Sequence, residues 1–223
     1  MSANRKNIAV ILAGGIGSRY GADLPKQYTL LNGREIISYT ICTCKGMENI
    51  DELIVVLDKE EYENGNIAKK YDVQTICGGA TRNESFKNAL EHVHKNFECE
   101  KIVFLEAARP LTKAAWLNDY FELLDEYEYE ESCLRIHDAL GGVKERIPNR
   151  DDYYLIQSPE AYRFLTIYKY FDGTSKVQHA AQQLPEDLQG YRYFLSNSNY
   201  KVTVPEDAAI IEYLLAYKEE KHD

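Results

Sequence analysis

The chain has 223 residues, of which 44% are hydrophobic and 28% are charged, and its formal net charge at pH 7 is −10. This length suits one α/β domain with a sizeable core, and the acidic balance argues against nucleic acid or an anionic membrane surface as a partner. No apolar run approaches about eighteen residues and no basic segment precedes one, so the sequence predicts neither a membrane span nor a signal peptide. We therefore expect a single cytoplasmic domain over residues 1–223, with its five scattered cysteines reduced.

The first predicted strand, Ile8–Leu12, is short and apolar and leads directly into a glycine-rich stretch. Three glycines follow within four positions, at Gly14, Gly15 and Gly17. Glycine lets backbone N–H groups approach a ligand closely, and a row of such amides after a strand forms a positively polarised cradle for phosphate. Beyond this loop Arg19 and Lys26 supply two cations that suit an incoming triphosphate.

The spacing of these glycines excludes two common nucleotide loops. Counted from Gly15 and Gly17, a GxGxxG dinucleotide fingerprint would need its last glycine at position 20, which is Tyr20. A Walker loop needs GxxxxGK followed by Ser or Thr, and this stretch has no Gly-Lys pair. On the glycines alone, a tight strand-to-helix turn with solvated cations remains the alternative.

Apolar runs and helical periodicity alternate along the following hundred residues. Thr29–Gly33 is predicted to form a short strand and a turn. After it we expect, in order, helix Arg34–Cys44, strand Asp51–Leu57, helix Glu60–Tyr71, strand Val73–Cys77, helix Ser85–Asn96, strand Lys101–Leu105 and helix Lys113–Tyr127. This alternation predicts a three-layer α/β/α fold with a mostly parallel, Rossmann-like twisted sheet. Ligands bind such sheets beyond the carboxyl ends of the strands. The acidic stretch Asp119–Glu131 is predicted to be a solvated helix face.

The pattern changes over residues 132–149 to short mixed stretches, which we interpret as an extended arm and not as a separate domain. After this arm we expect regular structure again, beginning with an ordered segment over Asp152–Phe164. The elements predicted after it are helix Leu165–Phe171, helix Val177–Leu184, strand Asn199–Thr203 and a last helix from Pro205 to about Tyr217.

The pattern AGGxGxR…PKQ, from Ala13 to Gln27, resembles the nucleotide-binding loop of sugar nucleotidyltransferases. It is most similar to the cytidylyltransferases that act on methylerythritol phosphate or ribitol phosphate, and the resemblance covers nearly the whole chain. It implies transfer of CMP from CTP to a phosphorylated acceptor, a Mg²⁺ cofactor, and a homodimer joined through the arm. It also implies catalytic roles for Arg19 and Lys26, and nucleotide binding by Leu12, Ala13, Gly14, Gly15 and Gly17.

Two segments after strands extend the resemblance. GGATRNES (Gly78–Ser85) resembles GGxxRxxS, which implies that Gly79, Ala80 and Ser85 contact the cytosine ring while Arg82 supports the loop. By itself, Ser85 would be a helix N-terminal hydroxyl. EAARP (Glu106–Pro110) resembles DAARP, which implies Glu106 as the metal ligand, Ala107 in the nucleotide site and Arg109 as a cation on the acceptor side. Glu106 has one methylene more than the family aspartate, so its carboxylate must sit differently to reach Mg²⁺.

NYKVTVPED (Asn199–Asp207) resembles NIKxTxPED, which implies that Lys201 is a cation near the phosphates. Without the resemblance, Lys201 would be a solvated lysine at a strand end. Arg150 matches the arm arginine that serves the acceptor pocket of a neighbouring subunit. The other residues that the resemblance assigns to the acceptor are Ala139, Ser158 and Gln178.

The departures from the family pattern are concentrated on the acceptor side. Ala139 stands where the family has threonine, Gln178-His179-Ala180 replaces Thr-Asp-Asp, and Ser158-Pro159-Glu160 replaces TPQ. Unmade buried hydrogen bonds cost ~1–3 kcal/mol each, so a different acceptor is expected, with His179 and His137 as further candidates for its pocket. We favour a CDP-polyol for wall or capsule polymers. The alternatives are a methylerythritol-phosphate cytidylyltransferase of isoprenoid synthesis, a nucleotidyltransferase with another base, and a catalytically silent nucleotide-binding homologue.

Overall fold

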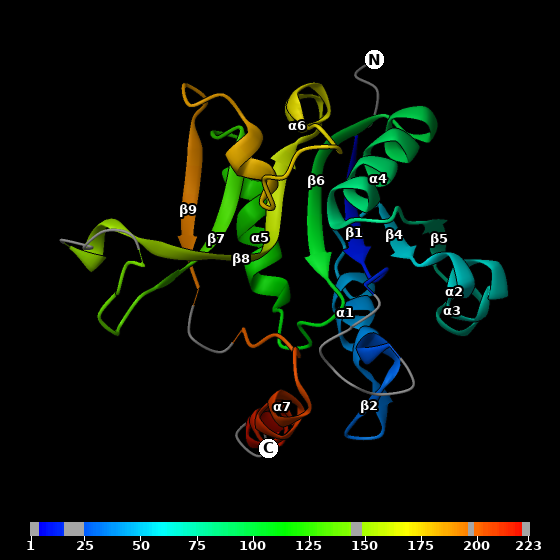
Figure 1. Cartoon of the computed structure of the whole chain (residues 1–223). Helices are drawn as coiled ribbons and strands as arrows, with labels where there is room; N and C mark the ends of the chain where they lie inside the picture. The colour runs from blue at the N-terminus through cyan, green and yellow to red at the C-terminus, as the bar shows by residue number, and fades with distance from the viewer. Residues whose placement is uncertain (1–4, 16–24, 144–148, 196–198, 220–223) are drawn as a thin grey trace.

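The computed structural model describes residues 5–15, 25–143, 149–195 and 199–219 (Figure 1). In this part of the chain seven strands form one sheet in the order β5-β4-β1-β6-β8-β7-β9. Their bounds are β1 Lys6–Leu12, β4 Glu52–Leu57, β5 Gln74–Cys77, β6 Cys99–Glu106, β7 Tyr129–Arg135, β8 Tyr154–Arg163 and β9 Gly190–Phe194. A separate antiparallel pair joins β2 (Leu30–Leu31) to β3 (Arg34–Glu35).

The centre of the sheet is parallel. Strands β5, β4, β1 and β6 run in one direction, whereas β8 is antiparallel to both β6 and β7, and β9 pairs with β7 in parallel. The apolar run of β1 is fully buried from Ile8 to Ile11, as expected for a strand covered on both faces. The predicted fold class is therefore confirmed.

Helices cover both faces of the sheet (Figure 1). On one face α1 (Ile36–Lys45) and α5 (Ala114–Leu123) pack against the strands, and on the other face α4 (Arg82–Asn96) and α6 (Phe164–Tyr170) do so. The last helix, α7 (Pro205–Glu219), begins at the predicted proline and packs with Leu31, Ile36 and Leu111 in a third apolar cluster. None of the helices in the described ranges is both long and apolar enough to cross a membrane.

The single helix predicted over Glu60–Tyr71 is wrong, because two short helices replace it. They are α2 (Lys59–Asn64) and α3 (Asn66–Tyr71), and Gly65 between them has a φ of 67°. A residue with a side chain rarely adopts this left-handed conformation, so Gly65 ends the first helix and redirects the chain.

The prediction of a solvated helix face over Asp119–Glu131 is wrong at its end. Helix α5 stops at Leu123, and Glu130 and Glu131 lie in β7 with exposed fractions of 0% and 5%. Glu131 accepts a hydrogen bond of 2.7 Å from the Tyr154 hydroxyl, whereas the Glu130 carboxyl has no hydrogen-bond partner among the described residues. Burial, with the nearby charges of two other carboxylates, raises the pKa of Glu130 well above its ordinary value.

The structure of the later part of the chain differs from the sequence prediction in four places. The predicted strand Asn199–Thr203 is wrong, because this described segment has no regular secondary structure. The predicted helix Val177–Leu184 is only a short 3₁₀ turn, η3 (Ala180–Gln183). Strand β9 was not predicted, and the first four residues of the predicted arm belong to β7. Beyond the sheet, the chain between β7 and β8 projects away from the body of the molecule (Figure 1).

Candidate active site

The carboxyl ends of β1 and β4 shape the first glycine segment. The Ala13 N–H donates to the Val56 carbonyl at 2.8 Å, which keeps the chain beside β4 as β1 ends. A Cβ on Gly14 would lie 3.3 Å from the backbone of Leu57 and Asp58, so the absence of a side chain permits this close approach. The Ala107 N–H donates to the Leu12 carbonyl at 3.1 Å. Gly15 is exposed, and the predicted site residues Gly17 and Arg19 lie outside the described residues.

A buried glutamine holds this segment, and sequence reasoning had given it no role. The Gln27 side-chain amide donates to the carbonyls of Ala13 at 2.6 Å and Gly15 at 3.1 Å, and only 2% of the residue is exposed. Gln27 lies in the 3₁₀ turn η1 (Lys26–Tyr28), so it also fixes where the backbone of Lys26 sits relative to the glycines. The PKQ motif was the available signal, since its glutamine follows the predicted catalytic lysine directly.

The loop between β5 and α4 closes on itself through side chains of the helix that follows. The Gly79 N–H donates to the Ser85 hydroxyl at 3.0 Å, and the Ala80 N–H donates to the Glu84 carboxylate at 2.7 Å. A Cβ on Gly79 would lie 2.2 Å from the Glu84 Cβ, so only glycine fits there. Thr81 is the N-cap of α4 and accepts the Glu84 N–H at 3.1 Å, so the cap position does not belong to Ser85.

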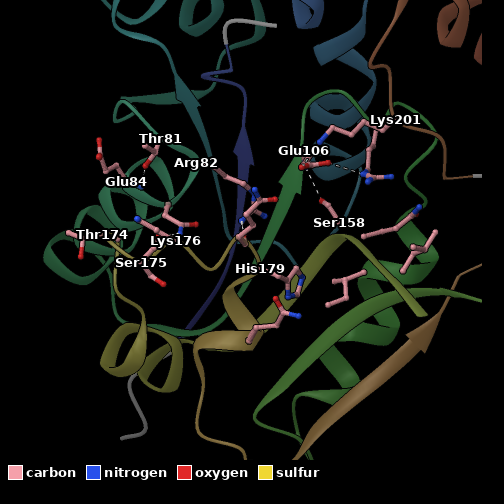
Figure 2. A pocket seen from close by; sticks show the side chains of 18 of the residues that line it. Thr81, Arg82, Glu84, Glu106, Ser158, Thr174, Ser175, Lys176, His179 and Lys201 are labelled. Carbon is pink, nitrogen blue, oxygen red and sulfur yellow. Dashed lines mark hydrogen bonds and ion pairs between the residues drawn. The ribbon is translucent and has the colours of Figure 1, made fainter. Parts of the chain in front are cut away.

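An acidic residue and two cations meet at the end of β6 (Figure 2). Glu106 Oε2 accepts from Arg109 Nε at 2.9 Å, and Glu106 Oε1 accepts from Lys201 Nζ at 2.9 Å. The backbone N–H of Glu106 donates to the Ser158 hydroxyl at 3.1 Å. Four residues that the sequence placed in the site are therefore in direct contact: Glu106, Arg109, Ser158 and Lys201.

Backbone contacts hold Lys201 in this cluster. The Val202 N–H donates to the Ala108 carbonyl at 2.9 Å, and Arg109 Nη1 donates to the Asn199 carbonyl at 2.8 Å. Asn199 in turn donates to the Ser158 carbonyl at 2.7 Å. Lys201 is therefore ion-paired with Glu106, although its side chain is 36% exposed and no strand forms around it.

The cluster keeps Glu106 ionised. Burial by itself would raise the pKa of this carboxyl, but the charges of Lys201 and Arg109 outweigh burial and lower the pKa to about 2. Magnesium sites in proteins commonly use one or two carboxylates together with substrate phosphates and water. The ionised Glu106 fits that requirement as a single carboxylate ligand. Among the residues the structure describes, no group of three or more His, Cys, Asp or Glu side chains is arranged to hold a metal ion by itself.

A cavity of about 1030 Å³ extends from this cluster to the start of α4 and the loop before η3 (Figure 2). Its walls include Arg82, Glu106, Arg109, Ser158, Gln178 and Lys201. Arg82 donates to the Gln178 carbonyl at 2.9 Å and pairs with Glu160, so it joins α4 to two other walls of the cavity. Ala139 and Arg150 do not line this cavity; both are exposed, and Arg150 donates to the carbonyl of His137.

A mostly parallel sheet, glycine segments after its strands and a cationic cluster beside a cavity at their carboxyl ends define an α/β nucleotidyltransferase. The family model described as "IspD: 2-C-methyl-D-erythritol 4-phosphate cytidylyltransferase" matches residues 7–217. The chain belongs to this family, as the sequence predicted.

Two curated relatives are each 30% identical to this chain over 228 residues and cover 94% of it. One is the 2-C-methyl-D-erythritol 4-phosphate cytidylyltransferase of Clostridium perfringens, 99% of which is matched. The other is the bifunctional ribulose 5-phosphate reductase/CDP-ribitol pyrophosphorylase Bcs1 of Haemophilus influenzae, and the chain spans 48% of that protein. The solved 4-diphosphocytidyl-2C-methyl-D-erythritol synthase of Anaerococcus prevotii has the same fold, with a TM-score of 0.82, 23% identity and coverage of 95% of this chain and 96% of that one.

Proposed function

We propose that this protein transfers CMP from CTP to a phosphorylated polyol or sugar-like acceptor and releases pyrophosphate. The observation that carries the proposal is the contact of Glu106 with Lys201 and Arg109 on the wall of the cavity. The cluster has an ionised carboxylate for a divalent cation and two cations for phosphate oxygens, and the loop that starts α4 borders the same cavity.

The reaction needs no nucleophilic side chain. The second pKa of a phosphomonoester is about 6, so the acceptor phosphate is largely dianionic near neutral pH. One of its oxygens attacks the α-phosphorus of CTP in line, a new P–O bond forms, and the bond to the departing pyrophosphate breaks. The protein then has to position the two substrates and neutralise charge in the transition state.

We assign charge neutralisation to Arg19, Lys26 and Lys201, and binding of the acceptor phosphate to Arg109. The base would lie against Gly79, Ala80 and Ser85, and the triphosphate along the segment from Leu12 to Gly17. Glu106 would hold Mg²⁺, which supplies Lewis-acid charge stabilisation at phosphate oxygens when it is bound.

Two observations favour a polyol phosphate acceptor. Ala139, Gln178-His179-Ala180 and Glu160 replace the hydroxyl, acidic and amide residues of the family pattern, and Gln178 and His179 line the cavity. A curated relative whose match covers 94% of this chain, and 48% of its own length, is named as a bifunctional ribulose 5-phosphate reductase/CDP-ribitol pyrophosphorylase. The second candidate function is methylerythritol-phosphate cytidylyltransferase, which is the activity that names the matched family model.

We further propose a cytoplasmic homodimer of a single domain, joined through the arm that follows β7. Tyr153 and Leu155, at the arm end of β8, are 46% and 52% exposed, and Phe194 of β9 is 41% exposed. Aromatic and aliphatic side chains exposed together are typical of subunit contacts. Arg150, which lies on this arm, would then serve the acceptor pocket of the second copy.

The test is pyrophosphate release with CTP and Mg²⁺, with ribitol phosphate, methylerythritol phosphate, glycerol phosphate and several sugar phosphates supplied separately. Release with ribitol phosphate supports the favoured acceptor, and release with methylerythritol phosphate alone supports the second candidate. A panel in which GTP, ATP or UTP replaces CTP tests the choice of base. CTP binding without pyrophosphate release for every acceptor would contradict the proposal and favour a silent homologue.

A further inference from the structure

A buried carboxylate lies behind one wall of the cavity. Glu160, on β8, has a side chain that is 1% exposed and is in contact with three polar groups. Arg82 donates a hydrogen bond to Glu160 Oε1, and the Tyr162 hydroxyl donates to Oε2 at 2.6 Å. The third group is His179, whose Nε2 atom lies 3.1 Å from Oε2. A buried carboxylate with a cation, a hydroxyl and an imidazole around it is well placed to fix the orientation of all three.

Glu160 is ionised despite its burial. Burial acts to raise the pKa of this carboxyl, but His179 and Arg82, with the hydrogen bond from Tyr162, lower it. The charge of Arg82 is therefore balanced inside the protein and does not stand alone in the cavity. Arg82 also donates to the Gln178 carbonyl at 2.9 Å, so the loop that carries His179 is attached to the same group.

Neighbouring contacts fix the rest of that loop. The Asn83 side chain donates to the carbonyls of Ser175 at 2.9 Å and Val177 at 2.8 Å. Together with Arg82, it ties the first turn of α4 to three carbonyls of one loop. These bonds hold the backbone before His179 in place. The backbone after it is held by η3, which begins at the next residue, Ala180.

His179 itself has an unsatisfied polar atom. Its side chain is 14% exposed and lines the cavity, and among the described residues neither ring nitrogen has a hydrogen-bond partner, although Nε2 lies within ion-pair distance of Glu160 and both atoms are buried. Such atoms are rare in folded proteins, and a ligand or an ordered water commonly supplies the missing partner. Nδ1 is buried as the ring stands, and because the χ2 torsion of histidine is broad, a rotation of the ring would turn this atom toward the cavity that the side chain lines. Figure 2 shows His179 away from Glu106 and Lys201, where the part of an acceptor remote from its reacting phosphate would lie.

We propose that His179 is a specificity-determining residue that binds a hydroxyl group of the acceptor, and that Glu160 is the positioning residue that holds its ring. The inference rests on the proposed function and names the acceptor chemistry of the same site. With Nε2–H facing Glu160, Nδ1 accepts a hydrogen bond from an O–H group when the ring is neutral and donates to a hydroxyl oxygen when the ring is protonated, so a hydroxyl group pairs with it in either state. The negative charge of Glu160 behind the ring disfavours a carboxylate at this position but not a hydroxyl. The acceptor class is therefore a neutral polyol chain that carries one phosphate, in preference to a phosphorylated sugar acid.

The test compares wild type, His179→Ala, Glu160→Gln and the double variant, with ribitol phosphate as the acceptor. We expect KM for ribitol phosphate to rise about tenfold in each single variant, the effect of one lost hydrogen bond, while KM for CTP stays within about twofold. Because Glu160 acts through His179, the double variant should also lose about tenfold and not a hundredfold. Phosphogluconate should be a poorer substrate than ribitol phosphate for wild type, and Glu160→Gln should narrow that difference.

Glu35→Gln is the matched control. Glu35 also accepts hydrogen bonds from one cation and one tyrosine, Lys70 Nζ at 2.6 Å and Tyr71 Oη at 2.6 Å, and it does not line this cavity. We expect wild-type KM values for Glu35→Gln. If Glu160→Gln does not fold, His179→Ala and His179→Gln carry the test, because the His179 ring borders the cavity.

The inference would be overturned if KM for ribitol phosphate and KM for CTP rose equally in the single variants. It would also be overturned if the increases in KM for ribitol phosphate were additive in the double variant, because either result would indicate a merely structural role. Calorimetric titration of ribitol phosphate onto protein with CTP but no divalent cation separates this inference from the proposed function. Acceptor binding that His179→Ala weakens, without turnover in the complete wild-type assay, would contradict the function and support the inference. Turnover in wild type with unchanged KM in His179→Ala would contradict the inference alone. Absence of both binding and turnover in wild type would contradict both.

Discussion

Replacement of Glu106 by glutamine tests the central cluster most directly. Glutamine has nearly the same shape as glutamate but no charge, so Glu106→Gln removes the ion pairs to Arg109 and Lys201 with little change in packing. Each of the two cations donates to a different Glu106 oxygen, and in glutamine one of these positions is an NH2 group, so in the same geometry one cation loses its acceptor and the Arg109 side chain, which is 9% exposed, loses its ion pair. We expect a folded protein that is less stable and nearly inactive.

The magnitude follows from the pKa of Glu106. A fall from 4.5 to about 2 corresponds to roughly 3 kcal/mol of additional stability when the carboxyl is ionised. The side chain is 17% exposed, so solvent screening reduces this value only slightly. Removing one partner of a buried ion pair typically costs ~3–5 kcal/mol, which agrees in size. We therefore expect Glu106→Gln to lower the free energy of unfolding by about 3 kcal/mol at pH 7.

The pH dependence gives the sign of the effect. The pKa of Glu106 is lower in the folded than in the unfolded protein, so its stabilisation is complete above the unfolded value of 4.5 and disappears as the pH falls toward 2. Urea unfolding of wild type and Glu106→Gln at pH 7, 5 and 3.5 measures this difference. The gap should be the same at pH 7 and 5 and smaller at pH 3.5. Pyrophosphate release should fall by about 10²–10³-fold at pH 7.

Glu106→Asp is the matched control, because it keeps the charge and shortens the reach. It should retain much of the stability, and its activity reports whether carboxylate position limits turnover. Wild-type stability of Glu106→Gln at pH 7, or a gap that persists unchanged at pH 3.5, would refute the electrostatic reasoning. Near-normal turnover would refute the role of Glu106 in the reaction.

Four further substitutions test the loop and the core. Lys26→Ala and Arg19→Ala should each reduce turnover by about 10²–10³-fold while the circular dichroism spectrum stays native, and near-normal activity in either variant would end the assignment. Gln27→Ala removes two hydrogen bonds to loop carbonyls, so CTP affinity measured by calorimetry should fall about tenfold, and unchanged affinity would contradict the bracing role. Glu130 has a raised pKa, so it stabilises the fold fully below about pH 4.3 and progressively less as the pH rises toward its folded value. Glu130→Gln should therefore gain stability over wild type as the pH rises above about 5, by up to about 1.4 kcal/mol per pH unit, and parallel pH profiles in urea unfolding would contradict this.

The parallel half of the fold could be predicted from the sequence because its strands are buried on both faces. Runs such as Ile8–Leu12 are continuously apolar, because a strand that is buried on both faces has no exposed face on which polar residues would alternate. Strand β9 gave no such signal, since it lies at the edge of the sheet and most of its residues are exposed. Its first residue, Gly190, would place a Cβ 2.0 Å from the Tyr129 ring, so glycine there reflects packing between neighbouring strands and not a turn.

The buried carboxylates were the least predictable feature. A run of acidic residues ordinarily lies on a solvated surface, and only the pairing of β7 with β8 and β9 explains why Glu130 and Glu131 are inside. The site residues were placed by motif resemblance, and the structure brings Glu106, Arg109 and Lys201 into contact. The hydrogen bonds from Gln27 to the carbonyls of Ala13 and Gly15 depend on the positions of those backbone oxygens, which no residue pattern specifies.

The attachment of Lys201 makes the chemistry sensitive to packing far from the cavity. Lys201 lies four residues before α7, and its neighbour Val202 is buried with Leu31, Ile36 and Ile211 in the cluster that docks this helix. A change of volume in that cluster would shift the helix and move the Lys201 ammonium group relative to Glu106, without any substitution in the cavity wall. Turnover could therefore be tuned in small steps by substitutions in this cluster, which does not line the cavity, and a search for faster or slower variants should include the buried contacts between α1 and α7.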